Sequence, residues 1–148
     1  MITFTFSPNA TRDVKKAFQD LSRAGQRATV AKAARAGARE IMLEARRLAP
    51  RSKKPRHPKG HAYKTIKYVL VDRWPDRAEY AIGPTDWGWY LALHEVGTSR
   101  FRAQPHLRPA LQAKAGAATA AAADVFRQAV AEAAARAAQR ARAAARRR

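Results

Sequence analysis

Apolar and polar residues alternate at the start of the chain. Ile2, Phe4 and Phe6 fall on one side of an extended backbone, and Thr3 and Thr5 fall on the other. A spacing of two is typical of a half-buried β-strand. We therefore predict a short strand over residues 1–7.

A helical spacing follows as far as Ala49. Val14, Phe18 and Leu21 recur at helical spacing, as do Ile41, Ala45 and Leu48, and small residues lie between the two groups. This pattern predicts one long helix that is capped at Asn9 or Thr11 and ends at Pro50. Two glycines inside this segment each cost about 1 kcal/mol relative to alanine in a helix. They predict either a kink near Gly25 or a close approach of another helix or subunit to the small residues.

Two further segments have strand character. Residues 63–72 and 78–83 are rich in β-branched and aromatic side chains, and a turn at residues 74–76 separates them. This arrangement predicts a β-hairpin. Because apolar residues occupy both faces of its first strand near the turn, Val69 and Val71 among them, we expect a sheet covered on both sides or a sheet face that forms an interface.

Residues 87–111 hold the most distinctive composition of the chain. The apolar positions here fit both the strand period of two and the helix period of 3.6. Apolar and polar residues alternate, but Trp89, Leu93 and Val96 also lie at helical spacing. We favour a short helix, followed by a chain reversal at Gly97.

The last segment is rich in alanine and arginine. Pro109 suits the first turn of a final helix, and 18 of the 34 residues from 115 to 148 are alanine, the strongest helix former. Only Val125, Phe126 and Val130 are large and apolar. This helix is favoured by propensity more than by packing, so we expect it to project, fray or lie on a neighbour.

These elements together predict an α+β fold. A long N-terminal helix packs on a small antiparallel β-sheet, and a long Ala/Arg-rich C-terminal helix follows. We expect residues 1–113 to form the domain and residues 114–148 a basic helical extension. No window approaches the roughly 18 continuous apolar residues of a spanning helix, and the N-terminus lacks the pattern of a signal peptide, so we expect no membrane association.

Charge adds an expectation about partners. The chain has 30 Lys and Arg against 11 Asp and Glu, a net charge of +19, and no cysteine. Such a protein commonly contacts nucleic acid or acidic surfaces, although a charge run can also be a solvated face. The candidate contacts lie in the loop after Pro50 and at the C-terminus: Arg51, Lys53, Lys54, Arg56, Lys59, Arg140, Arg142, Arg146, Arg147 and Arg148.

Catalytic and metal-binding patterns are weak. The acidic residues are scattered singly, and no glycine-rich phosphate loop is present. His57 and His61 are four apart, but Pro58 and Gly60 between them rule out a shared helix face. We therefore predict no enzyme activity, no cofactor and no metal site. Recognised nucleic-acid-binding modules are missing too, so charge supports only backbone contact.

The order of motifs resembles a known family. A long helix ends in Ala49-Pro50, a basic loop and a strand led by Gly60 follow, and then come three motifs: Ile82-Gly83-Pro84, the segment YLALHEVGT at 90–98, and PHLRPAL at 105–111. This order is similar to that of the tail-component family of long-tailed bacteriophages, called neck, tail completion or minor tail proteins of the head-to-tail connector. Two features depart from the family pattern: His106 stands where an aromatic such as Phe is usual, and the basic tail is longer.

The resemblance implies a structural virion protein of the neck or tail, assembled in the cytoplasm of the bacterial host. Its partners would be copies of itself in a ring, commonly a hexamer and alternatively a dodecamer, the adjoining connector and tail-terminator or tail-tube proteins, and, transiently, phage DNA. The expected subunit or ring interface comprises Trp87, Trp89, Tyr90, Leu93, His94, Glu95, Gly97, Thr98, Phe101, Leu107, Arg108 and Pro109.

Two alternatives stay open at this point. The first is a sequence-nonspecific protein that binds and compacts DNA through the basic loop and tail. The second is a small metal-dependent nuclease built around His57, His61 and His94.

Overall fold

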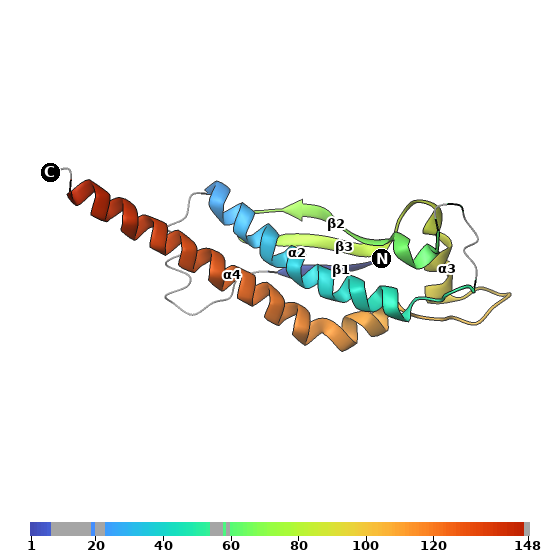
Figure 1. Ribbon diagram of the computed structural model, residues 1–148. Coiled ribbons are helices and arrows are strands. Elements are labelled where there is room, and N and C mark those ends of the chain that lie inside the picture. Colours follow the sequence, from blue (N-terminus) through green and yellow to red (C-terminus); the bar gives the residue numbers. More distant parts are fainter. Residues whose placement is uncertain (7–18, 20–22, 54–57, 59, 147–148) are drawn as a thin grey trace.

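The chain folds as a three-stranded sheet with two long helices. The computed structural model describes residues 1–6, 19, 23–53, 58 and 60–146 (Figure 1). One long helix lies across the sheet and a second runs beside the first. The predicted α+β class is confirmed.

The sheet is small and wholly antiparallel. Its strands are β1 (Ile2–Phe6), β2 (Ile66–Arg73) and β3 (Ala78–Pro84), in the order β1-β3-β2. The N–H of Trp74 donates to the carbonyl of Arg77 at 2.8 Å and closes the turn between β2 and β3. The predicted N-terminal strand and hairpin are both confirmed.

The alternation of each strand decides which face is covered. One face lies beneath helix α2 (Arg23–Leu48). On this face Phe4 of β1 is opposite Tyr80 of β3, and Ile82 follows two residues along β3. The Tyr80 hydroxyl donates to the carbonyl of Ala31 in α2 at 3.3 Å. On the opposite face Val69 is 49% exposed. Ala81 on the same face is 5% exposed, so the expectation of a sheet that is covered on both sides or forms an interface stays a prediction.

Helix α2 ends where the sequence predicts. Its last residue is Leu48, just before Pro50, whereas the expected start near residue 11 lies outside the described residues. Gly37 lies inside the continuous helix, and a Cβ atom there would come within 2.6 Å of the Phe4 ring and 2.8 Å of the Ala118 carbonyl. Close approach, one of the two expected reasons for the small residues, accounts for this glycine.

Helix α4 (Leu107–Ala145) runs antiparallel to α2. It buries Ala118, Ala122, Phe126 and Val130, which recur every four residues on one side. The helix is continuous through residue 113, so packing extends beyond the expected end of the domain, and the division there stays a prediction. Glu132, Ala133 and Arg136 still line a hollow with Gly25 and Ala28 of α2, and the last part of α4 projects beyond the start of α2 (Figure 1). None of the described helices is long and apolar enough to cross a membrane.

Short elements close one end of the molecule. Two 3-10 turns, η1 (Ala62–Thr65) and η2 (Asp86–Gly88), lie beside helix α3 (Tyr90–Val96) at the end of the sheet (Figure 1). The Thr85 hydroxyl donates to the carbonyl of Thr65 at 3.0 Å and ties β3 to η1. The apolar spacing of residues 87–96 fitted either a strand or a helix, and the predicted short helix is confirmed as α3.

Candidate interaction surface

Helix α3 presents an apolar stripe to solvent. Trp89, just before the helix, is 64% exposed, Leu93 is 39% exposed and Val96 is 65% exposed. Spacings of four and three place these side chains on one side of the helix, whereas Leu91 on the other side is buried in the core. We call Trp89, Leu93 and Val96 the α3 stripe. Clustered exposed apolar side chains of this kind mark interaction sites.

Aromatic contacts extend the stripe. Ring centroids of Trp89 and Tyr90 lie 6.4 Å apart, those of Tyr90 and His94 lie 6.3 Å apart, and those of His94 and Phe101 lie 4.9 Å apart. Phe101 is 38% exposed. The structure therefore brings five predicted interface residues together. Val96 was absent from that prediction, although its helical spacing from Trp89 could have found it.

A strained turn ends the helix. Gly97 has a φ of +78°, a conformation that side chains disfavour, and a Cβ atom there would lie 2.7 Å from the backbone nitrogen of Ala103. The N–H of Thr98 donates to the carbonyl of Phe101 at 3.0 Å. The predicted chain reversal at Gly97 is confirmed, and it folds the loop back against α3.

Glu95 links this turn to helix α4. Its Oε2 atom accepts hydrogen bonds from the N–H groups of His106 at 2.7 Å and Leu107 at 2.8 Å. Its Oε1 atom accepts the N–H of Arg108 at 3.0 Å. Backbone N–H groups in the first turn of a helix have no partner within the helix, and a carboxylate there also meets the positive end of the helix dipole. Glu95 is therefore an N-terminal cap supplied by a different helix.

The environment of Glu95 favours its charged form. Burial alone would raise the pKa of its carboxyl, but the three N–H donors and the neighbouring His106 outweigh burial and hold this pKa below the ordinary value of 4.5. The Glu95 side chain is only 9% exposed. The resemblance places Glu95 in the interface, and local spacing gave no sign of the cap.

His106 lies fully buried beside this carboxylate. Its Nδ1 atom is 3.2 Å from Glu95 Oε2 and 3.4 Å from the carbonyl of Gln104, while Nε2 has no hydrogen-bond partner among the described residues. Burial lowers the pKa of His106 below 6.5, although the Gln104 carbonyl and Glu95 act in the opposite direction. The contact at neutral pH thus joins a neutral ring to a carboxylate, with the ring proton on Nδ1.

The remaining predicted interface residues separate into buried and exposed ones. Leu107 is 1% exposed and belongs to the hydrophobic core, because the helical period turns it inward together with Ala110. Its place in the interface is therefore wrong. Trp87 and Pro109 are half-buried, and Arg108 and Thr98 are exposed.

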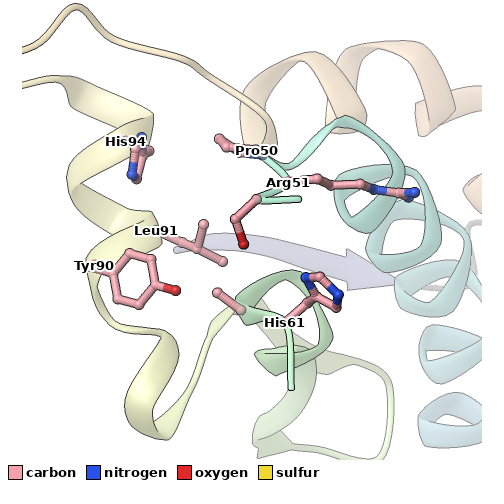
Figure 2. Close-up of a pocket in the computed structure, with 8 residues that line it drawn as sticks. Pro50, Arg51, His61, Tyr90, Leu91 and His94 are labelled. Atoms are coloured by element: carbon pink, nitrogen blue, oxygen red, sulfur yellow. The ribbon is translucent and has the colours of Figure 1, made fainter. Parts of the chain in front are cut away.

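A small hollow separates α3 from the end of α2. Pro50, Arg51 and His61 line one side, and Tyr90 and His94 line the other (Figure 2). The Arg51 side chain extends away from Tyr90 and His94, and its guanidinium lies over the ring of Tyr63 at 4.7 Å.

Two buried histidine ring nitrogens near this hollow have no hydrogen-bond partner among the described residues. Nδ1 of His61 and Nδ1 of His94 make no hydrogen bond within the described part of the chain. No three His, Asp or Glu side chains gather as metal ligands among the residues that the structure describes, and His57 lies outside them. The hollow therefore lacks the donor set of a metal centre.

The predicted basic residues fall into two separate places. Arg51 and Lys53 are exposed after the end of α2, and Arg140, Arg142 and Arg146 are exposed at the opposite end of the molecule (Figure 1). Five of the predicted contacts lie outside the described residues: Lys54, Arg56, Lys59, Arg147 and Arg148. The two basic regions do not form a single described patch.

Charge is distributed unevenly along the sequence. Residues 78–99 contain no Lys or Arg, but they include Glu79, Asp86 and Glu95. This segment forms β3, η2 and α3. The α3 stripe therefore lies in the longest stretch of the chain that is free of positive charge, a signal that was readable in the sequence.

Comparisons of the chain with protein-family models, with curated proteins and with solved structures found no match. The α3 stripe and the charge distribution are therefore the basis for a functional proposal.

Proposed function

We propose that this chain is a structural subunit of the head-to-tail connector of a long-tailed bacteriophage, a neck or tail completion protein. Copies of the chain form a ring that joins the capsid connector to the tail tube and lets DNA pass. The observation that carries the proposal is the exposed α3 stripe, which is fixed to the rest of the fold by the cap that Glu95 provides for α4.

The chemistry of the stripe supports a protein contact. Trp89 is a large amphipathic side chain of the kind enriched at the energetic centre of interfaces, and Leu93 and Val96 extend its apolar area. Because the Gly97 turn and the Glu95 cap fix the C-terminal end of α3, and Leu91 is buried in the core, the stripe is ordered before any partner arrives. A preordered surface loses less conformational entropy on binding.

The charge distribution supports assembly of like copies. Chains of net charge +19 repel one another, and the repulsion is weakest where positive charge is absent. The stripe lies in residues 78–99, which hold no Lys or Arg. The motif order that resembles the tail-component family includes the same segment, so the two lines of reasoning point to one surface.

A substitution in the stripe tests the proposal. We expect Val96→Asp and Trp89→Ala to weaken ring formation by about 10-fold to 100-fold in dissociation constant, the usual loss at an interface centre. Native mass spectrometry across a concentration series measures this. The matched control is Ala120→Asp, which adds the same charge at an exposed position of α4. A chain that is monomeric at every concentration, or variants that assemble like the control, would refute the proposal.

A second function is favoured by a separate observation. The C-terminal end of α4 exposes Arg140, Arg142 and Arg146, and no acidic residue follows Glu132. Such a helix suits salt-sensitive contact with the phosphate backbone of DNA. Deletion of residues 134–148 separates the two functions. A DNA-compacting protein loses affinity for DNA and has no defined ring, whereas the shortened connector subunit keeps a self-association through α3 that Val96→Asp weakens.

A further inference from the structure

Two surfaces of this chain are largely unpartnered within the part that the structure describes. The first is the arm, residues 134–145 of α4, in which every described side chain is exposed and Arg136 pairs with Glu132 of the same helix. The second is the outer face of the sheet, opposite α2. Strand register places these residues on this face: Thr3, Thr5, Lys67, Val69, Asp72, Glu79, Ala81 and Gly83.

Two rows of side chains cross the outer face, and one of them is acidic. Thr3, Ala81 and Val69 lie side by side across the three strands; Val69 is 49% exposed, whereas Ala81 is 5% exposed. The next row toward the hairpin is the acidic one, in which Glu79 lies directly opposite Asp72. An exposed apolar side chain therefore lies next to two acidic ones.

Like charges directly opposite on neighbouring strands destabilise a sheet, and neither Asp72 nor Glu79 takes part in an ion pair among the described residues. Two arginines in the described hairpin are near this row, but both are engaged elsewhere. The guanidinium of Arg77 lies 3.9 Å over the ring of Trp74, and Arg73 is opposite Ala78, on the face beneath α2. Cations from another chain would therefore relieve this repulsion.

The arm has complementary properties. Arg140 and Arg142 are exposed, no acidic residue occurs within the arm, and apart from its arginines and Gln139 the arm consists of alanine. A helix with alanine at its contact positions can approach a sheet closely, because the alanine side chain is small.

The dimensions also agree. Twelve helical residues span about 18 Å at 1.5 Å per residue. A five-residue strand such as β1 spans about 17 Å, so the arm is as long as the outer face. The arm cannot reach the outer face of its own chain, because α4 lies in the same layer as α2, on the opposite side of the sheet.

We propose that the arm of one copy docks on the outer face of a second copy. Arg140 and Arg142 are two positions apart and lie on opposite flanks of the helix, from which their long side chains reach Asp72 and Glu79 on either side of the helix axis. The contact joins two different surfaces, so repetition of it generates a closed ring or an open chain of subunits. The inference rests on the proposed function, since it names one of the contacts through which copies assemble. Nucleic acid is the competing occupant of the arm.

Cysteine cross-linking tests the contact directly, because the chain contains no cysteine. Full-length Val69→Cys and Ala138→Cys variants are mixed and treated with a short bismaleimide. We expect a covalent dimer of one chain of each kind. The control mixture replaces Ala138→Cys by Ala120→Cys, at an exposed position of the packed part of α4. Equal or no cross-linking in the two mixtures overturns the proposal.

Charge exchange distinguishes the two occupants of the arm. We expect Arg140→Glu with Arg142→Glu to weaken self-association at least 10-fold, Asp72→Arg with Glu79→Arg to do the same, and the fourfold variant to recover it. If the arm variant loses DNA binding while the fourfold variant fails to recover self-association, the arm serves nucleic acid and the docking proposal is wrong. If Val96→Asp still disrupts the ring in that case, the proposed function stands without this contact.

Discussion

The carboxylate of Glu95 accepts a hydrogen bond from the backbone N–H of Leu107 at 2.8 Å, so the last turn of α3 caps the first turn of α4. The same carboxylate binds the N–H groups on both sides of Leu107. One side chain therefore satisfies the start of the longest helix and fixes the position of the helix that carries the apolar stripe.

Removal of the cap is expected to destabilise the fold. Glu95→Ala leaves three N–H groups of α4 without an acceptor, and loss of a helix cap or of a charged hydrogen-bond acceptor costs about 1–3 kcal/mol. Urea unfolding measures the free energy of unfolding. Glu132→Ala serves as the control, because the exposed ion pair of Glu132 with Arg136 contributes no more than about 0.5 kcal/mol. Equal effects of the two variants would contradict the capping role.

Stability is expected to fall in acid in two stages. Burial depresses the pKa of His106 below 6.5, so its contribution is complete above pH 6.5 and is lost as the pH falls toward the folded-state pKa. Three N–H donors depress the pKa of Glu95 below 4.5 despite its burial, so its contribution is lost only below pH 4.5. Thermal unfolding across this pH range would show both declines, and a stability that is flat from pH 7 to pH 5 would exclude the first.

His106→Phe is expected to abolish the earlier of these two declines. Phenylalanine cannot titrate, and it removes the buried Nε2 atom that has no hydrogen-bond partner in the described structure. The variant keeps the backbone N–H that donates to Glu95. Its melting temperature should therefore change little between pH 7 and pH 5, while the decline below pH 4.5 persists. An unchanged pH profile would mean that a different group titrates.

Two glycines offer a matched test of helix packing. Gly37→Ala inserts a methyl group within 2.6 Å of the Phe4 ring and 2.8 Å of the Ala118 carbonyl, and such overpacking costs about 1–3 kcal/mol. Gly116→Ala in α4 has no atom within 4 Å of the new methyl group, so it should stabilise the chain by up to about 1 kcal/mol. Denaturant midpoints measured on both variants should shift in opposite directions.

The packed and projecting parts of α4 should differ in their contribution to stability. Phe126 is 3% exposed, and Phe126→Ala is expected to cost about 3–5 kcal/mol because it leaves a cavity in the core. Truncation after Ala133 removes only exposed described residues and should leave the free energy of unfolding nearly unchanged. Calorimetry compares the two forms, and a large loss on truncation would show that the arm packs against its own chain.

Much of the fold followed from local patterns. The alternation of Ile2 and Phe4 and the β-rich segments around Trp74 predicted the sheet, because strand burial repeats every second residue. Pro50 predicted the end of α2 because proline cannot continue a helix. These signals depend only on neighbours in the sequence, and the structure confirmed the elements they predicted.

The candidate surface was harder to predict because it depends on distant contacts. Glu95 meets its partners 11 to 13 residues later, and no helical or strand period connects positions so far apart. Leu107 was assigned to the interface, yet the packing of α4 against the core buries it. The tertiary fold decides whether an apolar residue is exposed or buried. For a residue in the first turn of a helix, the spacing of apolar residues in the sequence does not determine the answer.

Helix α4 is anchored at one end and unsupported at the other. Its 39 residues span about 58 Å, and side chains from Leu107 to Val130 pack in the core. A force applied to the free end therefore acts first on the packing around Phe126 and Val130. The Glu95 contact and α3 lie at the other end of the packed part, so mechanical load on the arm is absorbed before it reaches them.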